Sequence, residues 1–330
     1  MNKREIAQTI TASRKSDPGT EGIAFAPINI ALCKYWGKRD ELINLPVTSS
    51  LSISLRPLGT KTTVRIAKGV DRLVLNDREM PQECQTSQRV TEYLDLFRPD
   101  PHTAFHIESV TNVPIAAGLA SSASGFAALA LALDKLFGWE LDSLSLSILA
   151  RLGSGSASRS VFDGFVEWHA GEDPNGMDCY AERLPCEWPE FRVALVEISS
   201  EQKRVSSRTA MARTVRTSKL YQGWPARACA DLEELKAGIT ERDIVRVGSV
   251  AESNALAMHA TMLDSRPAVL YWKPETIKAI EKIWAIREAG STLYFTMDAG
   301  PNIKLLFDER DSTLVEDEFA PRSIITPFFA

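Results

Sequence analysis

Residues 114–124 read Pro-Ile-Ala-Ala-Gly-Leu-Ala-Ser-Ser-Ala-Ser, and a helical pattern follows them without a break. Gly118 permits close approach of a ligand to the backbone, and the side chains around it are small. Amide groups at the start of a helix lack partners within the helix, and together with the helix dipole they bind phosphate. Ser121 and Ser122 add hydroxyl groups that can contact phosphate or a bound Mg²⁺. The segment predicts a phosphate loop, although its spacing is not GxxxxGK[ST], and a small-residue cap of a core helix is the alternative.

Helix and strand patterns mix irregularly on both sides of this loop. Apolar residues spaced by three and four predict a helix from Ser124, closed by Gly138. The alternation over Leu51–Leu55 predicts a half-buried strand, and residues 23–33 look extended. The irregular mixture favours an α+β fold over a doubly wound α/β sheet. Further elements are expected as helices at 144–152, 206–219, 226–237, 244–263 and 274–289, and as a hairpin-like pair of strands at 293–297 and 303–307.

The length of 330 residues suggests two domains or one large one. The pattern changes around Cys186–Pro189, and the apolar stretch Phe191–Ile198 predicts a strand with new partners. We therefore expect a boundary near residue 190. The expected division is a polar lead-in over 1–22 that could be disordered, an N-terminal domain over 23–190 that contains the phosphate loop, and a C-terminal domain over 191–330.

Charge and composition exclude several classes of protein. The 38 Lys+Arg and 43 Asp+Glu give a net charge of −5, which argues against a nucleic-acid or anionic-membrane surface. The longest strongly apolar stretch, Phe126–Leu133, is far shorter than the ~20 residues of a membrane helix. Residues 1–20 lack the apolar segment of a secretory signal, and the five cysteines contain no CxxC pair. These features predict a cytoplasmic protein with reduced thiols, without excluding a local cation cluster for a small anion.

Five motifs, in order along nearly the whole chain, carry a family resemblance. The loop at 114–124 resembles the phosphate loop of the GHMP kinase superfamily. The others resemble the mevalonate diphosphate decarboxylase family within it, because several of its motifs recur here. They are Asn-Ile-Ala-Leu-Cys-Lys-Tyr-Trp-Gly-Lys-Arg-Asp at 29–40 with Leu-Pro-Val-Thr-Ser-Ser-Leu-Ser at 45–52, Gly-Ser-Gly-Ser-Ala-Ser-Arg-Ser at 153–160 with Gly-Phe-Val-Glu-Trp at 164–168, Ser-Ser-Arg at 206–208 and Asp-Ala-Gly-Pro-Asn at 298–302.

The resemblance implies a fold and an activity. The fold would be that of GHMP kinases, with a ribosomal-protein-S5-like N-terminal domain, a ferredoxin-like C-terminal domain and the active site in the cleft between them. The activity would be the ATP-dependent decarboxylation of mevalonate 5-diphosphate to isopentenyl diphosphate, ADP, phosphate and CO2, a step of isoprenoid biosynthesis. Phosphorylation of the C3 hydroxyl would turn a poor leaving group into a good one. The resemblance further implies ATP and Mg²⁺ as cofactors and a homodimer.

Five residues are implied to be catalytic. By the family match, Asp298 would orient and deprotonate the C3 hydroxyl. Arg159 would hold the substrate carboxylate through both its nitrogens, an interaction that lysine cannot copy, and Asn29 would position Arg159. Lys38 and Ser122 complete the set. Taken without the resemblance, Asp298 is better explained as a turn former, and Arg159 is equally well explained as part of a structural ion pair.

The implied substrate-binding residues are small or cationic, as an anionic ligand requires. We expect residues 154–157 to form a flexible loop whose amides face the ligand. The set is Tyr35, Lys38, Ser154, Gly155, Ser156, Ala157, Arg159, Ser207 and Arg208.

The implied ATP-binding residues lie in the phosphate loop. Mg²⁺ is expected to arrive with ATP rather than in an all-protein cage, with Ser122 as the hydroxyl that could contact it. The set is Pro114, Ala117, Gly118, Leu119, Ala120, Ser121, Ser122 and Ser124.

Three alternatives stay open at this point. A related enzyme could act on mevalonate 5-phosphate, or could phosphorylate mevalonate at C3 without decarboxylation. The residues that favour the diphosphate are Tyr35, Lys38, Ser207 and Arg208. A sugar or homoserine kinase of the same superfamily is the second. A non-catalytic binding protein on this fold is the third, and intact Asp298, Arg159 and Ser122 argue against it.

Overall fold

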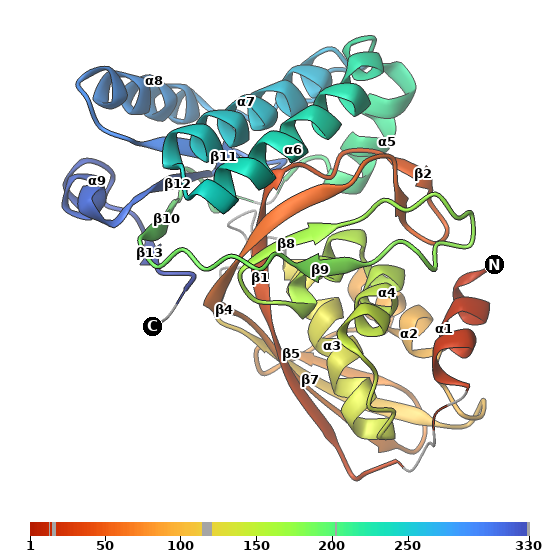
Figure 1. Ribbon diagram of the computed structural model, residues 1–330. Helices are drawn as coiled ribbons and strands as arrows, with labels where there is room; N and C mark the ends of the chain where they lie inside the picture. Colours follow the sequence, from red (N-terminus) through yellow and green to blue (C-terminus); the bar gives the residue numbers. More distant parts are fainter. Residues whose placement is uncertain (13, 15–17, 114–120, 202, 329–330) are drawn as a thin grey trace.

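The computed structural model describes residues 1–330 except 13, 15–17, 114–120, 202 and 329–330. Two main sheets and the helices packed on them make an α+β architecture, as predicted (Figure 1). No helix in the described part of the chain is long and apolar enough to cross a membrane.

The first sheet is built around one long strand pair. Its members are β1 (Gly22–Cys33), β4 (Ser50–Ala67), β5 (Arg72–Leu75), β6 (Arg78–Glu79), β7 (Ala104–Thr111), β8 (Phe165–Trp168) and β9 (Ala181–Arg183). The order is β6-β5-β7-β4-β8-β9, and β1 pairs antiparallel with β4 along nearly its whole length. Beside it, β2 (Lys38–Asp40) and β3 (Leu45–Pro46) form a small separate ladder.

The predicted strand at Leu51–Leu55 is buried on both faces rather than half-buried. Ser54 Oγ donates to the carbonyl oxygen of Phe162, and Ser50, just before the predicted strand, accepts from Arg159. Ser52 is also buried, but its Oγ has no partner among the described groups. Alternation of apolar and polar residues therefore correctly indicated a strand, but the polar face packs on the 155–162 segment.

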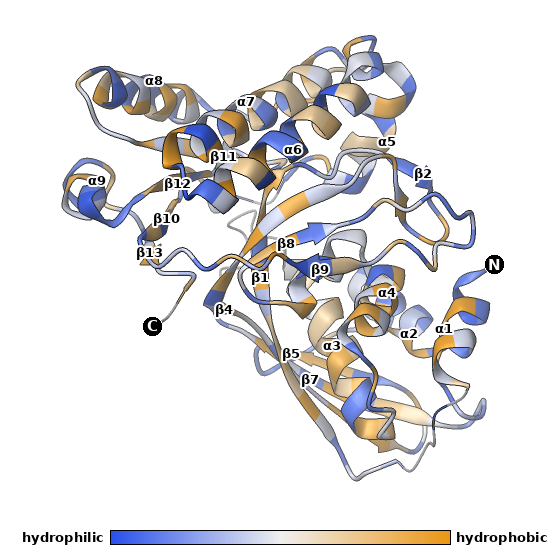
Figure 2. Ribbon diagram, viewed as in Figure 1, coloured by the Kyte–Doolittle hydropathy of each residue, from blue (hydrophilic) through white to orange (hydrophobic). Residues whose placement is uncertain are grey.

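One central helix covers β1 and β4. α3 (Ser121–Phe137) begins three residues before its predicted start and is followed by Gly138, whose φ of +63° suits the end of a helix. Most residues in the second half of the helix are hydrophobic (Figure 2). It lies so close to β1 that a Cβ on Gly22 would come within 1.9 Å of the carbonyl oxygen of Ala132. α2 (Gln85–Leu94) and α4 (Ser143–Gly153) lie on the same side (Figure 1).

The N-terminal lead-in is not disordered at its start, which corrects the prediction for 1–22. α1 (Lys3–Thr11) begins with a reciprocal capping box between Asn2 and Glu5. Ile6 and Ile10 enter the apolar core, and Arg4 donates to the carbonyl oxygen of Asp95 at the end of α2. The apolar residues of α1 are too few to give a clear helical pattern, so this helix depends on its packing against the core.

The second sheet starts with the strand predicted at residue 191. Its order is β11-β12-β10-β13, all antiparallel, and the predicted hairpin at 293–307 is confirmed. The strands are β10 (Phe191–Val196), β11 (Tyr294–Met297), β12 (Ile303–Asp308) and β13 (Ser323–Ile325). Besides α1 to α4, the helices are α5 (Ser207–Thr217), α6 (Trp224–Glu241), α7 (Ile244–Leu263), α8 (Pro274–Glu288) and α9 (Ser312–Phe319). The short 3₁₀ turns are η1 (Gly155–Val161), η2 (Leu220–Gly223) and η3 (Glu309–Asp311).

The two halves share apolar contacts instead of meeting only at a linker. Ile30 and Leu32 of β1 belong to the same buried cluster as Leu235 of α6 and Val247 of α7. In Figure 1, α6 and α7 lie across the upper end of β1. This packing brings the end of β1 next to the turn between β11 and β12.

Candidate active site

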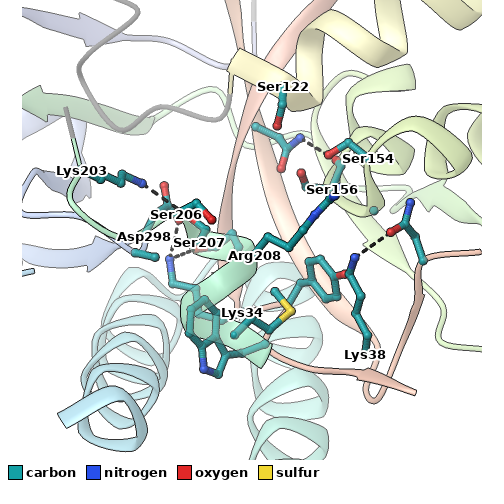
Figure 3. A pocket seen from close by; sticks show the side chains of 18 of the residues that line it. Lys34, Lys38, Ser122, Ser154, Ser156, Lys203, Ser206, Ser207, Arg208 and Asp298 are labelled. Atoms are coloured by element: carbon teal, nitrogen blue, oxygen red, sulfur yellow. Dashed lines mark hydrogen bonds and ion pairs between the residues drawn. The ribbon is translucent and has the colours of Figure 1, made fainter. Parts of the chain in front are cut away.

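A cavity of about 820 Å³ opens at this junction. Side chains from β1, α2, α3, η1, α5 and the β11–β12 turn face it, and Figure 3 shows Ser122, Lys38 and Asp298 around one space. Most of the site residues expected from the sequence line it: Asn29, Tyr35, Lys38, Ser122, Ser154, Gly155, Ser156, Arg159, Ser207, Arg208 and Asp298.

Asp298 is held by two ammonium groups. Its Oδ1 lies 3.2 Å from Lys34 Nζ and its Oδ2 lies 3.1 Å from Lys304 Nζ, and both lysine side chains are 2% exposed. Burial by itself would raise the pKa of the Asp298 carboxyl, but the charges of Lys304 and Lys34 outweigh it and hold that pKa well below its usual range. The carboxylate is therefore ionised and fixed at both oxygens.

The backbone of the same turn is fixed as well. The Asp298 carbonyl oxygen accepts from the Gly300 amide at 2.7 Å and from His259 Nε2 at 3.0 Å. Burial lowers the pKa of His259 to about 3, so the ring is neutral and its proton sits on Nε2. Asn302 closes the turn by accepting from the amides of Ile198 and Ser199. A side chain on this turn keeps one direction.

Arg159 is a buried guanidinium without a carboxylate partner in the described part of the chain. It is 3% exposed, donates to Ser50 Oγ at 2.5 Å, and its Nε and Nη2 both lie 3.3 Å from Asn29 Oδ1. The Asn29 amide nitrogen donates to Ser160 Oγ, so Asn29 contacts Arg159 as the resemblance implies. Burial lowers the pKa of Arg159 to about 10, against the opposing charge of Asp298. Such a group favours an anion in the cavity.

The 154–157 segment is ordered differently from the prediction. Instead of a flexible loop it enters the 3₁₀ turn η1, and Ala157 is fully buried in the core with its amide donated to Ser154. Ala157 therefore does not face the cavity. Gly155 does, and it lies against Tyr35, whose buried hydroxyl has no partner among the described groups. That hydroxyl is available to a ligand.

The opposite end of the cavity gathers cations. Lys38 Nζ donates to Asn44 Oδ1 at 2.7 Å and Arg89 donates to the carbonyl oxygen of Gly153, yet within the described residues neither they nor Arg208 form an ion pair. Burial, followed by the charge of Arg208, lowers the pKa of Lys38 to about 8. Lys3 of α1 lies close enough to these groups to be affected by them. Burial, followed by the charges of Arg208 and Arg89, lowers the pKa of Lys3. Repelling cations of this kind need an anionic ligand.

The start of α3 faces the cavity through Ser122, which is exposed. Ser121 is the first residue of the helix. Ser124, expected to bind ATP, is fully buried and its hydroxyl bonds with Thr60 Oγ1 at 2.8 Å, so it joins α3 to β4 instead. Pro114, Ala117, Gly118, Leu119 and Ala120 lie outside the described residues.

The sequence pattern missed several charged residues. Arg89 lies on α2, outside every motif, and nothing in its surroundings marks it. Lys203 lines the cavity, 3.5 Å from Ser207 Oγ, and its nearness to the 206–208 motif was the available signal. For Lys304 the signal was a charge placed between the apolar residues Ile303 and Leu305. In the described residues no three His, Cys, Asp or Glu side chains are grouped to hold a metal.

The α+β fold and its cation-lined cleft are those of a GHMP-type enzyme that handles phosphorylated substrates. Two family models match consecutive parts of the chain: the diphosphomevalonate decarboxylase-like N-terminal domain over residues 26–181, and the mevalonate 5-diphosphate decarboxylase C-terminal domain over 193–321. The chain belongs to the diphosphomevalonate decarboxylase family. α1 lies outside the matched residues.

Individual relatives agree over most of the chain. Diphosphomevalonate decarboxylase mvd1 of Aspergillus fumigatus is 38% identical over 314 residues, which cover 88% of this chain and 77% of that protein. A solved structure of MDDEF in complex with MVAPP, AMPPCP and magnesium is 39% identical with a TM-score of 0.86, covering 93% of this chain and 95% of the other. A structure of the mevalonate diphosphate decarboxylase from Enterococcus faecalis, also 39% identical and with the same coverage, gives a TM-score of 0.85.

Proposed function

We propose that this chain decarboxylates mevalonate 5-diphosphate with ATP, giving isopentenyl diphosphate, ADP, phosphate and CO2. One observation carries the proposal. The cavity joins an ionised, doubly held carboxylate (Asp298), a buried guanidinium without a carboxylate partner among the described residues (Arg159), and a group of cations at the far end. These match a hydroxyl, a carboxylate and a diphosphate on one small substrate.

The cofactors are ATP and Mg²⁺. The relative MDDEF was solved with MVAPP, AMPPCP and magnesium, and AMPPCP has the shape and charge of ATP. In this chain the start of α3, with the exposed Ser122 hydroxyl, is the element suited to the phosphates, because its first amides have no helical partners. Ser122 is the hydroxyl we assign to the nucleotide phosphates or their Mg²⁺, which supplies charge neutralisation when bound.

Asp298 and Arg159 act on the reacting carbon. The C3 hydroxyl donates to Asp298, its oxygen forms a bond with the terminal phosphorus of ATP, the bond to ADP breaks, and the hydroxyl proton passes to Asp298. Arg159, aimed by Asn29, holds the carboxylate so that the bond to be broken keeps one direction. The C3–O bond then breaks with phosphate leaving, and the electrons of the C–C bond form the alkene as CO2 departs.

The diphosphate is the handle that fixes the substrate. Lys38 and Arg208 offer charged donors, and Tyr35 offers a hydroxyl without a partner among the described groups. Ser154, Ser156 and Ser207 surround these groups and can satisfy the remaining phosphate oxygens. Hydrogen bonds from charged donors are roughly twice as strong as neutral ones, which suits recognition of a polyanion.

The same proposal includes the domain division, the cellular location and the oligomeric state of the protein. We assign the ATP-binding domain to residues 23–190 and the second domain to 191–330, since β10 starts a new sheet. A cytoplasmic location is supported by five cysteines that are all free. A homodimer rests on the family resemblance, and light scattering tests it by the mass in solution.

A direct assay tests the proposed reaction. The purified protein is incubated with Mg-ATP and, separately, with mevalonate, mevalonate 5-phosphate and mevalonate 5-diphosphate, while ADP and CO2 are measured. The expected result is equal release of ADP and CO2 in the incubation with mevalonate 5-diphosphate and none in the other two. ADP without CO2 would identify a kinase, and turnover only with the monophosphate would overturn the substrate.

A further inference from the structure

Lys304 is a buried charge behind the cavity, in contact with Asp298. It lies on β12, where the neighbouring residues 303 and 305–307 are buried and apolar, and its side chain is 2% exposed. Placing an ammonium group in such a strand is costly unless a charged partner compensates it. The partner is Asp298, at 3.1 Å from Lys304 Nζ.

The hairpin register explains how the two residues meet. β11 and β12 pair antiparallel with Met297 opposite Ile303 and Thr296 opposite Lys304. Asp298, one residue past the end of β11, therefore turns back over the first residues of β12. Lys304 does not line the cavity, whereas Lys34 does. The two lysines thus have different positions: one faces the substrate space, and the other supports Asp298 from behind.

Taking the proposed function as its basis, we propose that Lys304 is a positioning residue that keeps Asp298 ionised and aimed at the substrate hydroxyl. Lys34 is suited less well to this task alone, since it lines the cavity beside the reacting groups. Burial lowers the pKa of Lys34 to about 8, so its charge is partly lost in mildly alkaline solution. Lys304 supplies a second contact, at Oδ2, which holds the Asp298 carboxylate in one orientation toward the hydroxyl.

Charged and titratable groups approach Asp298 from several elements. Lys34 and Lys304 contact its two oxygens, and His259 of α7 contacts its backbone. Lys203, before α5, and Arg159 of η1 are near enough for the Asp298 charge to raise their pKa values against the effect of burial. His259 is neutral above about pH 3. Removing Lys304 therefore leaves Lys34 as the one direct cation among the described contacts to the carboxylate.

The first test replaces Lys304 by an uncharged chain of similar length. In K304M we expect kcat to fall at least tenfold with the KM for ATP within twofold, and the acid limb of the kcat profile to move to higher pH by about one unit. K304R should keep the acid limb close to that of the original chain. K282M, which removes a lysine from a surface pair with Glu318, is the matched control and should change nothing. An unshifted acid limb in a folded, active K304M would overturn the role of Lys304.

A second readout does not depend on turnover. The pKa of folded Asp298 lies below its unfolded value, so its ionisation stabilises the fold at pH above the unfolded pKa and is lost as pH falls through the folded one. K304M raises the folded pKa, and the acid loss of Tm should start at higher pH. In the D298N background, adding K304M should leave the acid dependence of Tm unchanged.

The two readouts separate the inference from the proposed reaction. An original chain that releases no CO2 from any mevalonate ester refutes the proposed function, whatever Lys304 does to Tm. An active original chain in which K304M alters neither the acid limb nor the acid dependence of Tm refutes the inference alone. If K304M fails to fold, K304R decides: a wild-type acid limb supports the charge, and a limb shifted as far as a unit contradicts it.

Discussion

The two ends of the cavity carry similar residues in opposite electrostatic states. At one end, Asp298 is neutralised by two lysines that approach both of its oxygens. At the other end, Lys38, Arg89 and Arg208 face the space with no ion pair in the described part of the chain. The first end is complete without a ligand, and the second is not.

This difference separates chemistry from capture. A catalytic group must keep its direction while bonds change, and fixed partners provide that without reorganisation. A binding group must change partners when the ligand arrives, so its charge is left without a protein partner and the ligand supplies one. Arg159 combines both properties. Asn29 and Ser50 fix its direction, while its charge has no carboxylate partner among the described residues until the substrate binds.

The largest effect is expected from Asp298→Asn, which breaks the preassembled end. An amide cannot take the hydroxyl proton, and turnover should fall on the order of 10²–10⁴-fold. ATP binding, measured by calorimetry, should stay within twofold, because we assign the nucleotide phosphates to the start of α3, whereas Asp298 lies on the turn between β11 and β12. Asp163→Asn, in a surface pair with Arg56, is the control. A variant that retains most of its rate would remove Asp298 as the proton acceptor.

Arg159→Lys should lower kcat/KM by on the order of 10–100-fold, the equivalent of about 1.5–3 kcal/mol for a charged hydrogen bond. Lysine keeps the charge but loses the forked contact with Asn29 and the second contact with the carboxylate. Folding is followed by thermal unfolding, with the exposed Arg183→Lys as control. A near-native rate in a folded variant would mean that Arg159 does not hold the carboxylate.

A change at the cation end of the cavity should alter the pH dependence of kcat/KM without abolishing turnover. Lys38 binds the diphosphate when protonated, and its pKa of about 8 in the unliganded protein means that kcat/KM falls as pH rises beyond that value. Lys38→Arg keeps the charge and should extend the alkaline limb upward. Lys34 shares a pKa of about 8, so the part of the limb that remains in this variant reports Lys34. A limb identical in both proteins would show that Lys38 does not control substrate capture.

The smallest effect is expected from Lys3→Met on α1. Lys3 adds charge to the cation group without lining the cavity, so its loss should raise the KM for the substrate about two- to fourfold at low salt and less at high salt. Lys135→Met, at the far end of α3, is the matched control. Equal KM values at all salt concentrations would confine α1 to a structural role.

Much of this molecule could be predicted from local patterns. The helix after the phosphate loop, the hairpin at 293–307 and the helix at Ile244–Leu263 follow from apolar spacing and turn residues, which act over a few positions. α1 could not be predicted this way, because only Ile6, Ala7 and Ile10 are buried and their contribution depends on α2 and α4. The motifs wrongly predict Ala157 and Ser124 at the ligand, because a motif does not say which of its residues faces the core.

The sequence alone determined the α+β class, the motif order and the family, because periodicity and motif spacing are local properties of the chain. Tertiary structure decided which charges are paired. Lys34 and Asp298 are separated by 264 positions, and their contact exists because β1 packs against the second half of the molecule. A net charge of −5 says nothing of this, since folding pairs some cations with carboxylates and leaves others facing the cavity.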